Sequence, residues 1–165
     1  MAKLQTDDNG LALTDNNGKP LVKTTGSVLQ VVSSTNITQS EISSTTFIAT
    51  HLSAVITPSR TSSKILIIAH GSTNTPGGSG THSIHTIFLN NTTNLGNAEF
   101  GMGNLASLSG GALPFEAFYS INYLHSPNTT SSTTYTVYGR QYSNGIGTFN
   151  LSSRTSSITL MEIAG

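Results

Sequence analysis

Apolar residues occur along this chain in short runs and in alternation with polar residues, and turn-forming residues separate the segments. The most apolar run is ILIIA at residues 65–69, which follows a Thr-Pro-Ser turn and is closed by Gly71. A helix is a poor interpretation, because the run is short, rich in β-branched isoleucine and bracketed by turn formers. We therefore predict a strand buried on both faces, in the middle of a β-sandwich.

Further strands are predicted on both sides of this run. In the last of them, residues 156–164, Ile158 and Leu160 share one face with Glu162, whereas Met161 lies on the other. The other predicted strands are residues 27–32, 45–50, 51–57, 82–90, 115–124, 133–142 and 147–152. This series of short strands, without an amphipathic helix, predicts an antiparallel all-β fold, a β-sandwich or a barrel, and the central apolar run favours the β-sandwich.

Two stretches have the composition of loops. Residues 72–81 (STNTPGGSGT) combine Pro, adjacent glycines and small polar residues, so we expect a surface loop. Residues 90–114 are rich in glycine and are expected to form a wide connection that contains one short strand or helical turn. Loops of this kind often make functional contacts.

An N-terminal arm, residues 1–26, is expected to precede a sandwich domain of residues 27–165. The Asn-Gly dipeptide at residues 17–18 separates two short apolar segments and favours a hairpin between them. Because an isolated hairpin is marginally stable in water, the arm should be mobile or docked on another subunit. The apolar residues that would dock are Leu11, Leu13, Leu21 and Val22.

The charge content is low and balanced. Only 8% of the residues are charged and the formal net charge is zero, which favours association with other copies. Nucleic-acid binding requires clustered Lys and Arg, and only Lys3, Lys19 and Lys23 come close together. The chain has no cysteine, which excludes disulfides, zinc-thiolate sites and thiol catalysis.

Targeting segments are not predicted. The first ten residues, MAKLQTDDNG, lack the apolar core of a signal peptide, and no stretch has the length of a membrane span. We expect a soluble protein that is synthesised in the cytoplasm and has no membrane partner.

No catalytic or metal-binding motif is apparent. Three of the seven acidic residues lie in the arm and four are scattered, and no nucleophile elbow, P-loop or dinucleotide motif occurs. His82 and His85 would point to opposite faces of a strand, so they cannot share a metal there. His51 and His125 are expected at strand ends or at subunit contacts. We predict a protein that is not an enzyme and has no cofactor.

The aromatic residues of the last third of the chain permit two interpretations, core packing or an exposed contact face. Tyr138, Arg140 and Tyr142 lie on one face of one predicted strand. These three residues are the candidates for a contact stripe.

Three stretches form a recognisable set: LQTDDNGLALTDNNGKPLVKTTGSVLQVV at residues 4–32, ITPSRTSSKILIIAHG at 56–71 and SSITLMEIAG at 156–165. In them a Thr-Pro-Ser turn feeds an apolar strand, and a Leu-Met-Glu-Ile strand closes the chain. The set resembles small structural proteins of tailed bacteriophages, especially marine and cyanobacterial ones. The matching features are strand and turn patterns, so no functional side chain carries over.

The resemblance implies a jelly-roll or C1q-like sandwich that assembles as a homotrimer on the virion. The short arm, without a shaft repeat, favours a capsid decoration (cement) protein on the capsid surface, with itself and the major capsid protein as partners. The alternative is a fibre or tail tip that binds a host-surface glycan through the contact stripe and residues 72–81.

Overall fold

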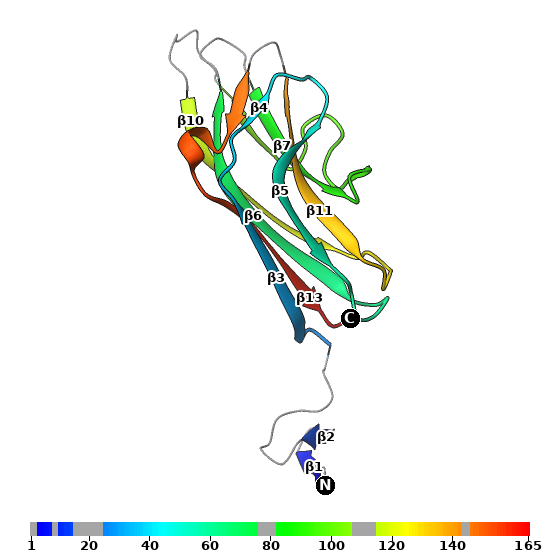
Figure 1. Ribbon diagram of the computed structural model, residues 1–165. Helices are drawn as coiled ribbons and strands as arrows, with labels where there is room; N and C mark the ends of the chain where they lie inside the picture. Colours follow the sequence, from blue (N-terminus) through cyan, green and yellow to red (C-terminus); the bar gives the residue numbers. More distant parts are fainter. Residues whose placement is uncertain (1–2, 8–9, 15–24, 76–81, 107–114, 143–145) are drawn as a thin grey trace.

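The computed structural model describes residues 3–7, 10–14, 25–75, 82–106, 115–142 and 146–165. Within these ranges the secondary structure consists of β-strands and one 3₁₀ turn, η1 (Leu151–Ser153). Two antiparallel sheets face each other, as Figure 1 shows. The prediction of an all-β sandwich is therefore confirmed.

The first sheet is built around the longest strand, β6 (Lys64–Thr75). One side of β6 pairs with β10 (Phe115–His125) along its whole length. The other side pairs first with β13 (Ser156–Ile163) and then with the short β12 (Gly147–Phe149). The sheet is completed by β3 (Val28–Asn36) next to β13 and β4 (Ser40–Ile42) next to β12.

The second sheet has β11 (Thr133–Gln141) between β5 (Ile48–Ile56) and β7 (His82–Leu89). The far side of β7 pairs with β8 (Thr93–Asn94) and β9 (Gly103–Ala106). Both short strands come from the stretch predicted as a wide connection, for which we expected only one short element.

The chain alternates between the two sheets, which gives a jelly-roll topology. From β5 onward the long strands β5, β6, β7, β10, β11 and β13 belong in turn to the second and the first sheet, and the first long strand, β3, pairs with the last. This order distributes the core over the whole sequence.

The core lies between the sheets and follows the period of two. Ile65, Ile67 and Ala69 of β6 point into it and are fully buried. Leu66 and Ile68 point outward and are half-buried, so the prediction of a strand buried on both faces is wrong. An unbroken apolar run fits a strand with two buried faces. It fits equally well a strand with one face in the core and an outer face that other described residues leave uncovered.

The expected loop at residues 72–81 begins later than predicted. Ser72–Thr75 continue β6, where Thr73 and Asn74 pair with both β10 and β12. The small polar side chains of these residues are typical of a loop. Here they form part of a strand, because the backbone pairs with neighbouring strands on both sides. Residues 76–81 lie outside the described residues.

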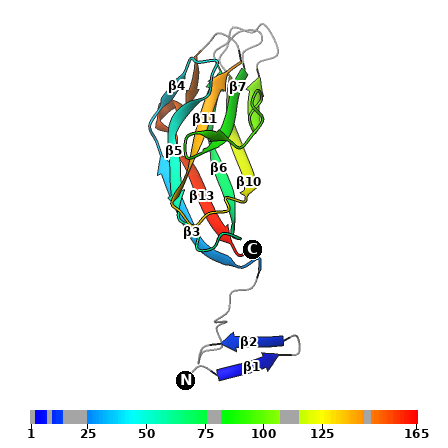
Figure 2. The same ribbon diagram turned by 90° about the vertical axis from the view of Figure 1, so that its right-hand side faces the viewer.

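The arm contains a two-stranded hairpin near its start. β1 (Lys3–Asp7) pairs with β2 (Gly10–Thr14), with Leu4 opposite Leu13, whereas the turn predicted at residues 17–18 lies outside the described residues. No described strand of the sandwich pairs with this hairpin, which Figure 2 draws apart from it. Of the predicted docking residues, Leu11 and Leu13 lie on β2, whereas Leu21 and Val22 lie outside the described residues.

The C-terminal strand and the Thr-Pro-Ser turn are joined by a buried carboxylate. Glu162 is fully buried and accepts hydrogen bonds from the Ser59 N–H and Oγ (both 2.7 Å), the Ser63 Oγ (2.6 Å) and the Gln30 Nε2 (2.6 Å). Burial alone would raise the pKa of Glu162, but these hydrogen bonds outweigh it and lower the pKa to about 2. Glu162 thus ties together the stretches on which the resemblance rests.

Candidate functional site

The predicted contact stripe lies on the outer face of the second sheet. Tyr138 and Arg140 belong to β11, where they pair with Thr86 and Ile84 of β7, and Tyr142 directly follows the strand. The guanidinium of Arg140 lies 5.9 Å from the ring centroid of Tyr142. The structure therefore brings Arg140 and Tyr142 together.

Tyr138 is used differently from the other two. Its ring stacks on Phe88 of β7, with ring centroids 4.0 Å apart, and Phe88 in turn lies 5.9 Å from Phe47. These rings pack against each other and form the base of a cluster. We call the cluster the aromatic face; it consists of Phe47, Phe88, Phe100, Tyr138, Arg140 and Tyr142.

Arg140 holds two chain segments against β11. Its Nη1 donates to the Thr45 carbonyl oxygen (2.9 Å), its Nη2 donates to the Glu99 carbonyl oxygen, and the guanidinium lies 5.4 Å above the Phe47 ring. Thr45 precedes β5, whereas Glu99 lies between β8 and β9. Arg140 is thus fixed in position by contacts from both sides.

The segment between β8 and β9 presents Phe100. The Asn97 side-chain oxygen accepts hydrogen bonds from the backbone N–H groups of Glu99 and Phe100 (both 2.8 Å), and the Met102 N–H donates to the His85 carbonyl oxygen (2.8 Å). Gly101 has φ 58°, and a Cβ there would collide with that same oxygen. These contacts fix the turn that carries Phe100.

Phe100 and Tyr142 form the exposed part of the aromatic face. Their rings are nearly parallel, with an interplanar angle of 17° and centroids 5.9 Å apart, and their exposed fractions are 47% and 46%. Alternation along β7 could have pointed to Phe88, because that strand was predicted. Phe100 has no such signal, since it lies in a glycine-rich connection.

The positive charge of Arg140 is not balanced by a nearby acid. Among the described residues the single ion pair joins Arg154 and Glu116 (2.5 Å), and no carboxylate lies within 4.0 Å of the Arg140 guanidinium. The Arg140 Nε is buried without a hydrogen-bond partner. The aromatic face therefore combines exposed rings with an unpaired cation.

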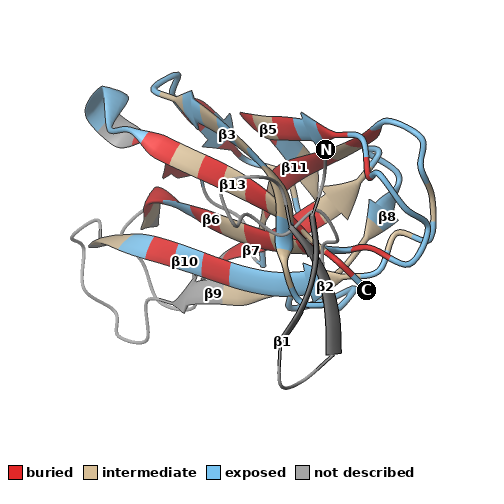
Figure 3. Ribbon diagram, turned by 90° about the horizontal axis from the view of Figure 1, so that it is seen from below, coloured by how far each residue is buried: buried red, intermediate tan, exposed pale blue. Residues whose placement is uncertain are grey.

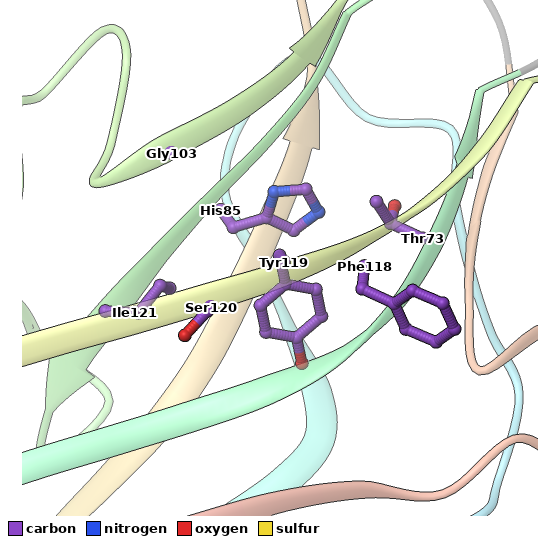
Figure 4. Close-up of a pocket in the computed structure, with 7 residues that line it drawn as sticks. All are labelled: Thr73, His85, Gly103, Phe118, Tyr119, Ser120 and Ile121. Atoms are coloured by element: carbon purple, nitrogen blue, oxygen red, sulfur yellow. The ribbon is translucent and has the colours of Figure 1, made fainter.

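A pocket of about 200 Å³ lies beside β10, and Figure 4 shows the residues that line it. Its walls come from residues 118–121 of β10, Thr73 of β6, His85 of β7 and Gly103 of β9. No charged side chain lines it. The sequence did not predict this pocket.

His85 is the most unusual residue of this pocket. It is buried, its ring stacks on Tyr119 (4.9 Å) and meets the edge of Phe149 (4.7 Å), and neither ring nitrogen has a hydrogen-bond partner. Burial lowers the pKa of His85 to about 4, and the nearby backbone of Gly103 opposes this shift only in part. His85 is thus a neutral core residue that joins the two sheets.

This burial predicts acid sensitivity. Because the pKa of His85 falls from 6.5 to about 4 on folding, the unfolded chain binds more protons between these pH values. Above pH 6.5 His85 is neutral in both states and does not change the free energy of unfolding. As the pH drops toward 4 this free energy should fall, by about 2 kcal/mol near pH 5. Burial also lowers the pKa of His125, which adds to the same fall. Urea denaturation at pH 7 and pH 5 measures the loss.

The variant His85→Phe keeps the ring contacts and should abolish most of that pH dependence. His51→Gln, at an exposed position of β5, is the matched control and should retain it. An unchanged pH dependence in His85→Phe would show that another group is responsible.

His125 and His51 each connect a strand of one sheet with a strand of the other. The His125 Nδ1 lies 2.9 Å from the Tyr135 hydroxyl, and His125 ends β10, as predicted. The His51 Nδ1 lies 2.6 Å from the Ser40 Oγ of β4. His51 lies within β5 and not at a strand end, so the other expectation, a subunit contact, stays a prediction for it.

An apolar row crosses the outer face of the first sheet. The strand register places Val31 opposite Met161, Met161 opposite Leu66, and Leu66 opposite Leu124. Val31 and Leu124, at its two ends, are 55% and 50% exposed, and Phe118 on the same face is 80% exposed. Figure 3 shows exposed residues along much of β10. We call the row Val31, Met161, Leu66 and Leu124 the apolar row.

No group of three or more metal-ligating side chains occurs in the described ranges. A helix long and apolar enough to cross a membrane is likewise not found among the residues that the structure describes. In comparisons with known proteins, neither the protein-family models nor the curated proteins gave a match to this chain.

Proposed function

We propose that this chain is a structural protein of a tailed-bacteriophage virion, which forms homotrimers and decorates the capsid as a cement protein. The observation that carries the proposal is the apolar row, an outer sheet face with large apolar side chains that no described residue covers. Contiguous apolar surface of this kind marks an interaction site. The resemblance to phage structural proteins supplies the location.

Self-association is the use of the apolar row that the charge content supports. The chain has zero net charge, so copies do not repel one another strongly. The row reaches from β3 at one edge of the sheet to β10 at the other. A contact between different edges of neighbouring copies generates a closed ring when the rotation closes, as in a trimer.

Mutation of the apolar row tests this association. Val31→Asp should convert trimers to monomers, because it places an unpaired charge in an apolar contact. Val55→Asp is the matched control, since Val55 is 49% exposed but lies on the outer face of the second sheet. Sedimentation velocity distinguishes the outcomes, and a trimer that survives Val31→Asp would rule out this contact.

Attachment to the capsid is assigned to the arm. The β1–β2 hairpin has no described sandwich strand to pair with, and an isolated hairpin is marginal in water. Docking on the major capsid protein would stabilise it, and three arms on one trimer would multiply the affinity. Decorated particles should therefore resist heating better than particles stripped of the protein.

Removal of residues 1–26 tests this assignment. The shortened protein should fold and form trimers, because the two sheets are complete without the arm, but it should not add to stripped particles. Leu11→Ser with Leu13→Ser should weaken addition while leaving the melting temperature of the free trimer nearly unchanged. If the shortened protein decorated particles fully, attachment would belong to the sandwich.

The second candidate function is a fibre or tail tip that binds a host-surface glycan. Specific support comes from the half-exposed rings of Phe100 and Tyr142 beside the unpaired Arg140. Residues 72–81 were expected to form a loop that contributes to glycan binding. Ser72–Thr75 instead belong to β6, which lies in the other sheet. A tip is present in few copies per virion, whereas a decoration protein is present in many.

A further inference from the structure

We propose that the aromatic face binds a saccharide that carries one carboxylate, a uronic acid, with Arg140 on the carboxylate and the rings of Tyr142 and Phe100 against the sugar. The inference rests on the second candidate function and names the ligand class of that site. It depends on the charge and geometry of three residues, and it does not depend on how many copies a virion carries.

The hydrogen bonds of Arg140 leave suitable donors free. A guanidinium has five N–H groups. One on Nη1 and one on Nη2 bind the carbonyl oxygens of Thr45 and Glu99, and the Nε–H is buried. One N–H therefore remains on each terminal nitrogen, which is the number needed to bind both oxygens of a carboxylate. The two carbonyl contacts also hold the guanidinium in place before a ligand arrives.

The rings supply the other half of the site. Phe100 and Tyr142 are nearly parallel and half-exposed, and Tyr142 lies next to the Arg140 guanidinium. The C–H face of a sugar ring packs on such flat apolar surfaces. The Asn97 hydrogen bonds keep the Phe100 turn fixed, so little ordering is needed on binding. Tyr138 is excluded from direct contact, because its ring packs tightly on Phe88, with centroids 4.0 Å apart, and it is less exposed than Phe100 and Tyr142.

The charges around Arg140 favour one negative group on the ligand. No described acid pairs with Arg140, so a ligand carboxylate gains a full charge-assisted contact. Glu99 is exposed on the same turn, and its carboxylate would repel a densely sulfated or phosphorylated chain. A single carboxylate, with hydroxyls elsewhere on the ring, fits both features.

The experiment is an NMR titration of the full chain with methyl β-D-glucuronide and, separately, methyl β-D-glucoside, which differ only in the carboxylate. The glucuronide should bind about tenfold more tightly at low salt, with shifts centred on Phe100 and Tyr142. The difference should shrink at high salt, because the charge contact is exposed.

Three variants locate the contact. Arg140→Gln should remove the preference for the glucuronide, Tyr142→Ala should weaken both sugars equally, and Glu99→Gln should strengthen the glucuronide alone. Arg154→Gln, whose guanidinium pairs with Glu116 on the first sheet, is the matched control and should change nothing. If Arg140→Gln loosened the fold, Tyr142→Ala and Glu99→Gln would still decide the matter.

Each result has a definite meaning. Equal binding of the two sugars would overturn the uronic-acid inference and leave glycan binding standing. Binding of neither sugar would overturn both, and would leave the capsid-decoration proposal untouched. Preference for the glucuronide that persists in Arg140→Gln would also overturn the inference, because the carboxylate would then bind elsewhere.

Discussion

Glu162→Ala should lower the free energy of unfolding by about 3–5 kcal/mol, a large effect for a single side chain. The carboxylate is fully buried and accepts four hydrogen bonds, from Ser59, Ser63 and Gln30. Its removal leaves these donors without an acceptor, and hydrogen bonds to a charged group are stronger than average. Urea denaturation near pH 7 measures the change.

The acid dependence gives an independent check on Glu162. Because the folded pKa is lowered from 4.5 to about 2, the stabilisation is complete above pH 4.5 and is lost as the pH falls toward 2. Glu162→Gln should remove this part of the acid dependence, whereas Glu41→Ala, at an exposed position of β4, should not. A cost below about 1 kcal/mol for Glu162→Ala would mean that the turn is held by other contacts.

Ile67→Ala should cost about 2–5 kcal/mol, the usual range for a large-to-small change in a packed core. Ile67 is fully buried between the sheets, next to Leu160 of β13. The neighbouring Leu66 points outward into the apolar row, so Leu66→Ala should cost the isolated subunit much less. Denaturant unfolding of dilute, monomeric protein makes the comparison.

The pair also separates the two faces of β6. In the proposed trimer, Leu66→Ala should reduce stability in a concentration-dependent way, because the proposal places this side chain in the contact between copies. Ile67→Ala should reduce stability at every concentration. Equal costs in the monomer would show that the outer face of β6 is covered within one chain.

Period-two patterns predicted most of the fold. They located β13 and placed Ile158, Leu160 and Glu162 on one shared face, and in the structure all three are buried. They could not decide the outer face of residues 65–69, because an apolar side chain has the same local pattern whether it packs on a core or on a second copy. The sequence pattern also could not predict that Ser72–Thr75 belong to a strand, since their pairing partners are distant in the sequence.

The candidate site was predicted only in part. Alternation placed Tyr138 and Arg140 on one face of a strand, and the structure has them on the outer face of β11. The Glu99 carbonyl reaches Arg140, and Phe100 reaches Tyr142, because Asn97, Gly101 and the β7 backbone shape the turn. Such non-local contacts leave no periodic signal in the sequence.

The burial of His85 was likewise not predicted. Its side chain lies on the inner face of β7, against Tyr119 and Phe149 of the other sheet, and these partners are distant in the sequence. On the outer face Ile84 and Thr86 are buried as well, since the segment between β8 and β9 covers them.

Quantitative mass spectrometry of purified virions tests the central proposal most directly, by counting copies of this chain relative to the major capsid protein. A capsid decoration protein should be present at a fixed, high ratio to the major capsid protein and should be lost from the head when the arm is removed. A few copies per particle, found with the tail or fibres, would contradict the decoration function.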